Sequence, residues 1–216
     1  MAKKLYAILF LVAALGLGLW AQSTFITIGG TAIEIPEPEV SGPKVDEASL
    51  TAAIPSDMQG GKIQAVYGDL SAVQAMIAED NSITLKNPLY LALSVSELDN
   101  MDMGDTDISA MSDGIVQGMF DGISAVSNDE QEKPIIPMIL GEYFRTKYAV
   151  GYTILIQEEP NSDPMIMVIA PMVVKGKLLI CMIMLDYKDS LSINKAERYA
   201  RGWVQDIYRV NYTRHK

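Results

Sequence analysis

The sequence of 216 residues contains one cysteine, Cys181, and one histidine, His215, which lies one residue from the C-terminus. A single cysteine excludes a disulfide within the chain and a cysteine-rich zinc site. A single histidine at this place excludes an internal Ser-His-Asp triad, a Cys-His pair and a His-ligated zinc centre. The sequence also lacks a phosphate-binding loop pattern and a dinucleotide fingerprint. We therefore expect no cofactor, and catalysis is the less favoured class of function.

The composition is that of a folded domain. Hydrophobic residues make up 49% of the sequence and aromatic residues 7%, which excludes a disordered chain. The length suits one domain with a continuous core. Acidic residues outnumber basic ones, 27 to 17, for a formal net charge of −10. Because the chain is acidic and its basic residues are not interleaved with aromatic ones, we expect no nucleic-acid partner.

The charge is unevenly divided along the chain. Residues 23–132 contain 19 acidic and three basic side chains, a balance of −16, whereas residues 133–216 contain eight acidic and 12 basic ones, a balance of +4. Such polarity permits docking on a charged partner or head-to-tail association. The simpler interpretation, which we favour, is neutralisation within one fold.

The N-terminus carries the three parts of a secretory signal. Lys3 and Lys4 form a positive segment, and residues 5–15 (LYAILFLVAAL) form an apolar one. Residues 16–23 are rich in small side chains, with Ala21 expected just before the cleavage site. The sequence thus predicts an extracytoplasmic protein, either periplasmic or secreted.

An uncleaved anchor is the alternative, because residues 5–21 approach the length of a bilayer span. The membrane is a partner only through this segment, if the signal stays attached. The chain then divides into the signal segment, residues 1–23, a single globular α/β domain, residues 24–212, and a short basic tail, residues 213–216.

Alternation of apolar and polar residues predicts four strands in the first half of the chain. Gly29-Gly30 is typical of a two-residue turn and joins the first two strands into a hairpin. Ser71 suits the start of a short helix over residues 71–78. The four strands cover residues 24–28 (TFITI), 31–35 (TAIEI), 63–67 (IQAVY) and 89–95 (LYLALSV).

A longer helix is predicted over residues 107–127, where apolar residues recur at three- and four-residue steps. Asp107 is the expected cap, because its side chain accepts hydrogen bonds from the first backbone amides. Gly114, Gly118 and Gly122 fall every fourth residue on this helix. We interpret the glycine row as a place where the helix backbone lies close on a sheet, at some cost in helix propensity.

The second half of the chain predicts antiparallel strands followed by a helix. The strands cover residues 148–157, 165–174 and 178–187, with an interruption or bulge expected at Pro171. Lys175-Gly176-Lys177 is typical of a hairpin turn between the last two strands. Ser192 is expected to cap a helix that ends near residue 211. The buried stripe of this helix comprises Ile193, Ala196, Ala200, Trp203, Val204 and Ile207.

These elements predict an α+β fold, a predominantly antiparallel sheet covered by helices in an α/β/α sandwich. The opening hairpin (TFITIGGTAIEIP, residues 24–36), the mid-chain helix, the long strands and the closing unit (KLLICMIM, then Ala196 to Ile207) resemble the PsbP-like group of small domains. The resemblance is architectural and spans about residues 24–210. It implies an exported assembly factor or binding subunit with little catalysis, although a shared fold does not by itself confer a function.

An acidic loop is the densest cluster of oxygen ligands. It contains Glu97, Asp99, Asp102, Asp105 and Asp107. Calcium needs several carboxylates and carbonyls at short range, and such a loop supplies them. The spacing is not that of an EF-hand. The alternative, which we favour, is a solvated loop in which Asp107 caps the following helix.

Three Met-x-Met pairs suggest a second kind of metal site. Thioethers are soft ligands that favour Cu(I), and alternate residues of a strand share one face. Packing in a core is the alternative for the strand pairs, since methionine fills gaps among aliphatic residues. Cys181 lies in the most apolar strand, so we expect a buried, unreactive thiol. The pairs are Met101/Met103, Met165/Met167 and Met182/Met184.

The last predicted helix carries a basic outer face. This face and the basic tail suit an acidic partner or anionic lipid, or they pair with the chain's own acids, which contributes only about 0–1 kcal/mol per exposed pair. Asn211-Tyr212-Thr213 matches a glycan acceptor, which we expect to be unused. The basic residues of the outer face are Lys195, Arg198, Arg201 and Arg209.

Three functions remain after these exclusions. The favoured one is an exported, non-catalytic binding or assembly domain with an unknown protein or cell-envelope partner. The first alternative is an extracytoplasmic metal-binding protein that holds calcium in the aspartate loop or copper on methionines. The second is a hydrolase that uses carboxylates.

Overall fold

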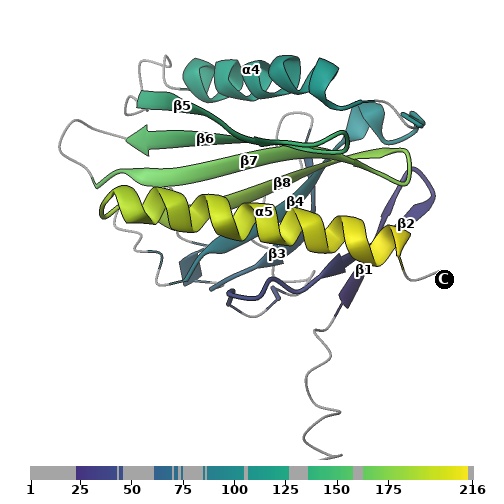
Figure 1. Cartoon of the computed structure of the whole chain (residues 1–216), viewed down its shortest axis with the longest axis horizontal. Coiled ribbons are helices and arrows are strands. Elements are labelled where there is room, and N and C mark those ends of the chain that lie inside the picture. The colour runs from purple at the N-terminus through teal and green to yellow at the C-terminus, as the bar shows by residue number, and fades with distance from the viewer. Residues whose placement is uncertain are drawn as a thin grey trace, which may run out of the picture.

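Six antiparallel strands form the central sheet of the protein (Figure 1). The structure is a computed structural model and describes residues 23–42, 44–45, 61–69, 71–72, 74, 85, 87–104, 107–126, 136–157 and 163–213. The strand order is β3-β4-β8-β7-β6-β5, so β3 and β5 lie at the two edges. The strands are β3 (Gly61–Tyr67), β4 (Leu89–Val95), β5 (Ile136–Arg145), β6 (Val150–Gln157), β7 (Met165–Val174) and β8 (Lys177–Asp186).

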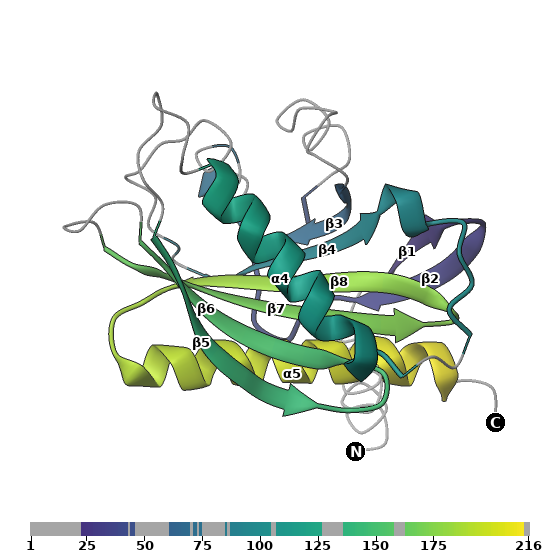
Figure 2. The same cartoon turned by 90° about the horizontal axis from the view of Figure 1, so that it is seen from above.

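A hairpin and two helices cover the two faces of this sheet. β1 (Ser23–Ile28) pairs with β2 (Thr31–Pro36) in a separate two-stranded sheet. α5 (Ser190–Tyr212) packs on β7, β8 and β2, whereas α4 (Ser109–Val126) lies on the opposite face over β5, β6 and β7 (Figure 2). A short 3₁₀ helix, η1 (Ser96–Leu98), follows β4. The predicted α+β fold, an antiparallel sheet between helices, is confirmed.

Alternate residues of the central strands belong to two separate cores. In β7, Ile166 and Val168 pack beneath α5, whereas Met167 and Ile169 pack on the other face. Successive side chains of a strand point to opposite faces, so a strand covered on both sides needs apolar residues throughout. β8 shows the same pattern, as the continuous apolar run in its sequence predicted.

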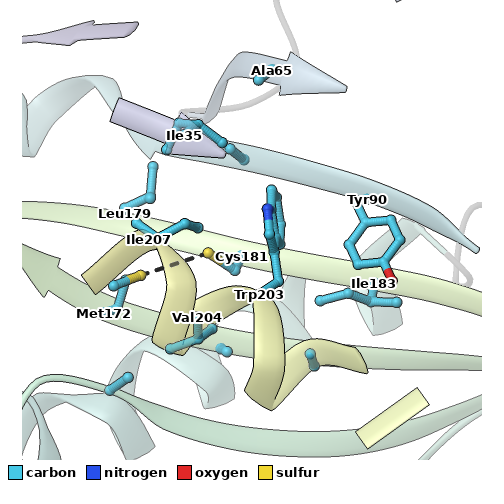
Figure 3. Packing of buried hydrophobic residues seen from close by; sticks show 14 of the residues in the cluster. Ile35, Ala65, Tyr90, Met172, Leu179, Cys181, Ile183, Trp203, Val204 and Ile207 are labelled. Carbon is cyan, nitrogen blue, oxygen red and sulfur yellow. Dashed lines mark hydrogen bonds between the residues drawn. The ribbon is translucent and has the colours of Figure 1, made fainter. Parts of the chain in front are cut away.

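Trp203 of α5 lies at the centre of the core between that helix and the sheet (Figure 3). Its ring meets the rings of Tyr67 and Tyr90 edge to face, at 6.1 and 5.2 Å between centroids. Its Nε1 donates to the carbonyl of Pro36 at 2.9 Å, and the Tyr67 hydroxyl donates to the carbonyl of Ile35 at 3.2 Å. Aromatic packing and hydrogen bonds thus fix the N-terminal hairpin to both α5 and the sheet.

α5 begins two residues before the predicted cap. Asp189, not Ser192, is the cap, and its Oδ1 accepts from the backbone N–H of Ser192 at 3.0 Å. Aspartate and serine are both common helix caps, so the residue type alone does not decide where this helix begins. The predicted stripe is otherwise confirmed: Ala196, Ala200, Trp203, Val204 and Ile207 are buried, and Ile193 is half-buried.

Pro171 does not bulge β7. It pairs with Ile180 in an unbroken ladder between β7 and β8. The backbone N–H of Val173 donates to the carbonyl of Tyr148 at 2.8 Å, toward β6. Since residues two apart in a strand point the same way, the N–H that proline lacks also lies on the β6 side. The ladder between β6 and β7 ends at Ile169, two residues before Pro171, and Met172 then forms an isolated bridge with Ala149.

α4 agrees with the predicted helix, but its glycines do not mark a close approach. Asp107 is a cap as predicted, because its Oδ1 accepts from the backbone N–H of Ser109 at 2.9 Å. A Cβ at Gly114 or Gly118 would meet nothing within 4 Å, so both face open space. The close approach predicted for these two glycines is therefore wrong. The surroundings of Gly122 lie outside the described part.

Three predicted segments fall largely outside the described residues and stay predictions. Only Ser23 of the signal segment and only Thr213 of the basic tail are described. Of the predicted helix over residues 71–78, residues 71, 72 and 74 are described, and they are helical. In the part of the chain that the structure describes, no helix combines the length and apolar character that crossing a bilayer requires.

Candidate functional site

β5 is an edge strand that no sequence pattern predicted, and it carries an exposed apolar patch. Met138, Ile139 and Leu140 follow one another and are 56%, 40% and 43% exposed. Side chains of a regular strand alternate between its faces, so three exposed neighbours need an irregularity. A register shift between Ile139 and Gly141 supplies it, because Leu140 has no partner on β6. We call Met138, Ile139 and Leu140 the β5 patch.

A second register shift lies between Glu142 and Phe144 and brings two aromatic rings to one side. The rings of Tyr143 and Phe144 meet at 4.8 Å between centroids and pack against the core beneath α5. Both lie over Gly151 of β6, where a Cβ would collide with them. The two irregularities therefore divide β5 into an outward apolar half and an inward aromatic half.

Arg201 joins α5 to the aromatic half of β5. Its guanidinium carbon lies 5.7 Å from the centroids of both the Tyr143 and the Phe144 rings, a cation–π arrangement. Its Nη2 donates to the carbonyl of Tyr143 at 2.9 Å. Among the described residues, the Tyr143 hydroxyl is buried without a hydrogen-bond partner, and burial raises the pKa of this hydroxyl. One predicted partner-binding residue thus lies at the sheet edge.

The flank of α5 that carries Arg201 follows β5 toward the patch. Glu197, one turn earlier, accepts a hydrogen bond from the Thr153 hydroxyl of β6 at 2.8 Å. Thr153 pairs with Gly141, the residue directly after the β5 patch. Arg198 is exposed and precedes Arg201 by three residues, so both project from one flank of the helix. Met138, which pairs with Leu155, therefore lies on the same face of the sheet as this flank, whereas Ile139, which pairs with Ile154, points to the opposite face.

The other two predicted basic residues differ in their surroundings. Lys195 is exposed, and its Nζ lies 5.7 Å from the centroid of the Tyr199 ring, over which Arg198 also lies at 5.5 Å. Arg209 is two turns beyond Arg201 and forms an ion pair with Asp206 at 2.8 Å. For Arg209, the alternative interpretation, an ion pair with an acidic residue of the same chain, is therefore confirmed. The assignment of all four basic residues to partner binding stays a prediction.

Lys177, the first residue of β8, reaches into the acidic loop for which calcium was predicted. Its Nζ donates to the carbonyls of Asp99 at 3.1 Å and Met101 at 2.8 Å, and the side chain is buried. The backbone N–H of Met103 donates to the carbonyl of Gly176 at 2.8 Å, which fastens the loop to the β7–β8 turn. An ammonium group therefore takes backbone oxygens of the kind that a calcium ion would use.

The described aspartates of this loop do not converge. Oδ1 of Asp102 accepts from the backbone N–H of Gly104 at 2.9 Å, whereas Asp107 caps α4. Hydrogen bonds from Ser109 lower the pKa of Asp107. No group of three or more His, Cys, Asp or Glu side chains in the described ranges is arranged to hold a metal ion. Asp105 lies outside them, so the calcium site stays a prediction.

The sulfur-containing residues lie on both faces of the sheet. Cys181 is fully buried beneath α5, its Sγ is 3.7 Å from Sδ of Met172, and burial raises the pKa of the thiol (Figure 3). The prediction of a buried cysteine is confirmed. Met101 is 52% exposed and Met103 is buried, so this loop pair is split. The strand methionines, Met165, Met167, Met182 and Met184, belong to the apolar cluster on the opposite face.

Two carboxylates come together on Arg145, at the end of β5. Its Nε donates to the Glu142 carboxylate at 3.0 and 3.1 Å, and its Nη2 lies 3.8 Å from Asp113 of α4. The Tyr152 hydroxyl donates to Asp113, and Nη1 of Arg145 donates to the carbonyl of Ser109 at 3.2 Å. Hydrogen bonding to Glu142 raises the pKa of Arg145. The cluster joins α4 to β5 and β6, and the hydrolase alternative stays a prediction.

Comparison with known proteins gives distant structural likeness alone. No family model and no curated protein matches the sequence. The Ran-binding protein Mog1p of Saccharomyces cerevisiae is similar in structure, with 9% identity and a TM-score of 0.41, and a mutant of protein Mog1 has 10% identity and a TM-score of 0.42. Each match covers 88% of this chain and 93% of the other. Likeness this distant carries no argument about function, and the PsbP-like resemblance stays a prediction.

Proposed function

We propose that this protein is an extracytoplasmic, non-catalytic domain that binds a protein partner at the β5 edge. One observation carries the proposal: the β5 patch is exposed along the sheet edge, and its Met138 lies on the same face of the sheet as the basic flank of α5 that holds Arg198 and Arg201. Contiguous exposed apolar side chains with a polar rim are typical of interaction sites. Methionine and arginine are both enriched in such interfaces.

The partner docks on side chains rather than by adding a strand to the sheet. Pro137 has no N–H, and two register shifts interrupt β5. Prolines and bulges on an edge strand discourage pairing with another strand. The chemistry of the surface instead calls for apolar side chains opposite the β5 patch. It also calls for carboxylates opposite Lys195 and Arg198, which are exposed.

Export places this surface in the cell envelope or outside the cell. The support is the signal pattern of Lys3, Lys4 and the apolar residues 5–15. In this proposal the partner is therefore an envelope or secreted protein. The same role, an assembly factor or binding subunit, is what the PsbP-like resemblance implies.

The test is retention of a partner from a cell-envelope extract by the immobilised protein. Ile139→Asp puts a charge in the β5 patch, and Arg198→Glu reverses a charge on the basic flank. Leu191→Asp and Lys188→Glu make the same changes at exposed positions elsewhere and serve as controls. We expect one protein to be retained by the wild type and both controls, lost with Ile139→Asp, and weakened by Arg198→Glu and by high salt.

The outcomes of this experiment distinguish an error in the location of the binding surface from an error in the proposed binding function. Circular dichroism of each variant first establishes that it is folded. A partner that binds Ile139→Asp as tightly as the wild type, or that is lost equally with Leu191→Asp, contradicts the β5 edge as the binding surface. If the wild type retains no protein at low or at high salt, the proposed function itself is wrong.

A further inference from the structure

Three tyrosines stack where the end of α5 meets the turn between β5 and β6. Tyr148 belongs to that turn, and Tyr208 and Tyr212 lie one turn apart on α5. The rings of Tyr148 and Tyr208 are 3.8 Å apart between centroids and 14° from parallel. The rings of Tyr208 and Tyr212 are 4.5 Å apart and 32° from parallel. The first pair therefore lies face to face, whereas the second pair is tilted.

The contact between Tyr148 and Tyr208 is closer than ordinary aromatic packing. Aromatic pairs in proteins have centroids about 4.5–7 Å apart and prefer offset or edge-to-face arrangements to a face-to-face sandwich. Carbon atoms that are not bonded to each other approach to about 3.5 Å. At a centroid distance of 3.8 Å, two nearly parallel rings are therefore offset by less than about 2 Å, so each ring covers most of the other.

The main chain holds both rings in place. Oγ1 of Thr146 accepts from the backbone N–H groups of Tyr148 at 3.3 Å and Ala149 at 2.9 Å, which fixes the turn. The carbonyl of Tyr148 accepts from the backbone N–H of Val173 at 2.8 Å. Tyr208 is held by α5, which packs on β7 and β8. Both rings pack against the core beneath α5 and are half-buried, so solvent still reaches the pair.

Face-to-face phenol rings suit the coupling of two tyrosyl radicals. Removal of one electron and one proton from each phenol leaves unpaired spin on the ring carbons next to the C–OH carbon, in orbitals perpendicular to the ring. In stacked rings these orbitals point at each other. A C–C bond forms between one such carbon of each ring, and the hydrogens on these two carbons move to the phenol oxygens, which restores both aromatic rings. Because the fold holds the rings in contact, the coupling step needs no diffusional encounter.

We propose that Tyr148 and Tyr208 form a dityrosine cross-link within the chain when the protein meets hydrogen peroxide and a peroxidase. The two electrons and two protons taken from the phenols reduce one hydrogen peroxide molecule to two water molecules. The new bond ties α5 to the turn between β5 and β6, a task that no disulfide within this chain can perform, because Cys181 is the single cysteine. The β5 patch lies at the other end of β5, so this proposal and the proposed function fail independently.

The experiment is oxidation of the full chain with hydrogen peroxide and a peroxidase, at a low protein concentration that disfavours coupling between chains. We expect the monomer to gain dityrosine fluorescence and to lose the mass of two hydrogen atoms. Tyr148→Phe should remove most of this fluorescence, because phenylalanine keeps the ring but has no phenol hydrogen to lose. Tyr187→Phe, at a half-buried position directly after β8, and Tyr212→Phe, at the tilted ring, are the controls and should retain the fluorescence.

Peptide mapping of the oxidised wild-type monomer identifies the coupled residues directly, which decides the matter if a variant does not fold. We expect one linked pair of peptides, which contains Tyr148 and Tyr208. The cross-linked monomer should also unfold at a higher urea concentration than the untreated protein, because the bond constrains the unfolded chain as a disulfide does. The proposal is overturned if the monomer gains no dityrosine, if the link joins Tyr208 to Tyr212 or any other pair, or if Tyr148→Phe couples as much as the controls.

Discussion

The side-chain amide of Asn211 binds both backbone groups of Glu34. Glu34 donates its backbone N–H to Oδ1 of Asn211 at 3.0 Å, and Nδ2 of Asn211 donates to the Glu34 carbonyl at 2.8 Å. Asn211, near the end of α5, thus forms hydrogen bonds with the outer edge of β2 of the kind that a neighbouring strand would form. Nδ2 also donates to the carbonyl of Ile207 at 2.8 Å. Since Asn211 is buried and its amide is occupied, a glycan on the Asn-Tyr-Thr acceptor sequence would be incompatible with this packing.

Asn211→Ala should lower the free energy of unfolding by about 2–4 kcal/mol. The substitution removes the hydrogen bonds that the buried backbone N–H and C=O of Glu34 form with the Asn211 amide, and losing such a bond costs roughly 1–3 kcal/mol. Urea denaturation at neutral pH measures the change. Asn194→Ala, at an exposed position of the same helix, should change the value by no more than about 0.5 kcal/mol. Equal effects of the two substitutions would mean that the hydrogen bonds between Asn211 and Glu34 do not stabilise the fold.

Gly151→Ala should destabilise the protein by about 1–3 kcal/mol, because the new methyl group collides with the rings of Tyr143 and Phe144. Phe144→Leu in the same chain should recover part of the loss. Gly118→Ala on the open side of α4 should instead stabilise the helix by about 0.5–1 kcal/mol. Thermal and urea unfolding compare the three variants. A neutral Gly151→Ala would mean that the rings do not pack over β6.

Lys177→Met should destabilise the protein by about 1–3 kcal/mol, because the carbonyls of Asp99 and Met101 lose their donor. We also expect faster proteolysis in residues 96–104. Lys188→Met, at an exposed position, is the control. Since the Lys177 ammonium already uses the loop carbonyls, excess calcium should leave the Tm of the wild type unchanged. A rise in Tm with calcium would show that the loop holds a metal ion after all.

Cys181 should make stability fall in alkaline solution. Burial raises the pKa of this thiol in the folded state, whereas an unfolded thiol ionises near about 8.5. Below that pH both states hold the proton and the contribution is fully present. Above it the unfolded state loses the proton first, so stability declines, with a slope approaching about 1.4 kcal/mol per pH unit.

Urea unfolding of the wild type and of Cys181→Ala between about pH 7.5 and 9.5 isolates this contribution. The substitution has its own constant cost from the missing sulfur, so the slopes against pH are compared rather than the absolute values. We expect the wild type to lose stability more steeply than Cys181→Ala above about pH 8.5. Parallel slopes would mean that the thiol is accessible to solvent in the folded protein.

β5 shows where a period-two pattern stops being informative. Leu89–Val95 was predicted from its alternation and Met165–Val174 from a long β-rich segment, and both begin and end at the predicted residues. Ile136–Arg145 contains two register shifts, so its apolar side chains stand next to one another instead of alternating. A search for alternation therefore passes over this strand, and with it the β5 patch. Irregularities of this kind depend on the partner strand, which the local sequence does not name.

The candidate sites also contain features that the sequence predicts and features that depend on contacts between distant parts of the chain. Spacing on a helix was enough to place Lys195 and Arg198 on an exposed face. It gave no means of knowing that Arg201 would lie on two rings of β5. Likewise, the density of acids in the loop was visible in the sequence, whereas the Lys177 ammonium that contacts the loop comes from a strand 76 and 78 residues away.

The sequence by itself determined which residues of α5 are buried and that β8 is covered on both faces, because the direction of a side chain relative to its helix or strand is a local property of the backbone. It also determined the fold class, since alternating strands and amphipathic helices leave few ways to bury their apolar faces. Only the tertiary structure decided that Met167 meets Met184, that Lys177 enters the acidic loop, and that an apolar edge lies beside Arg201. Strand order and register arise from contacts between residues far apart in the chain, and no local pattern fixes them.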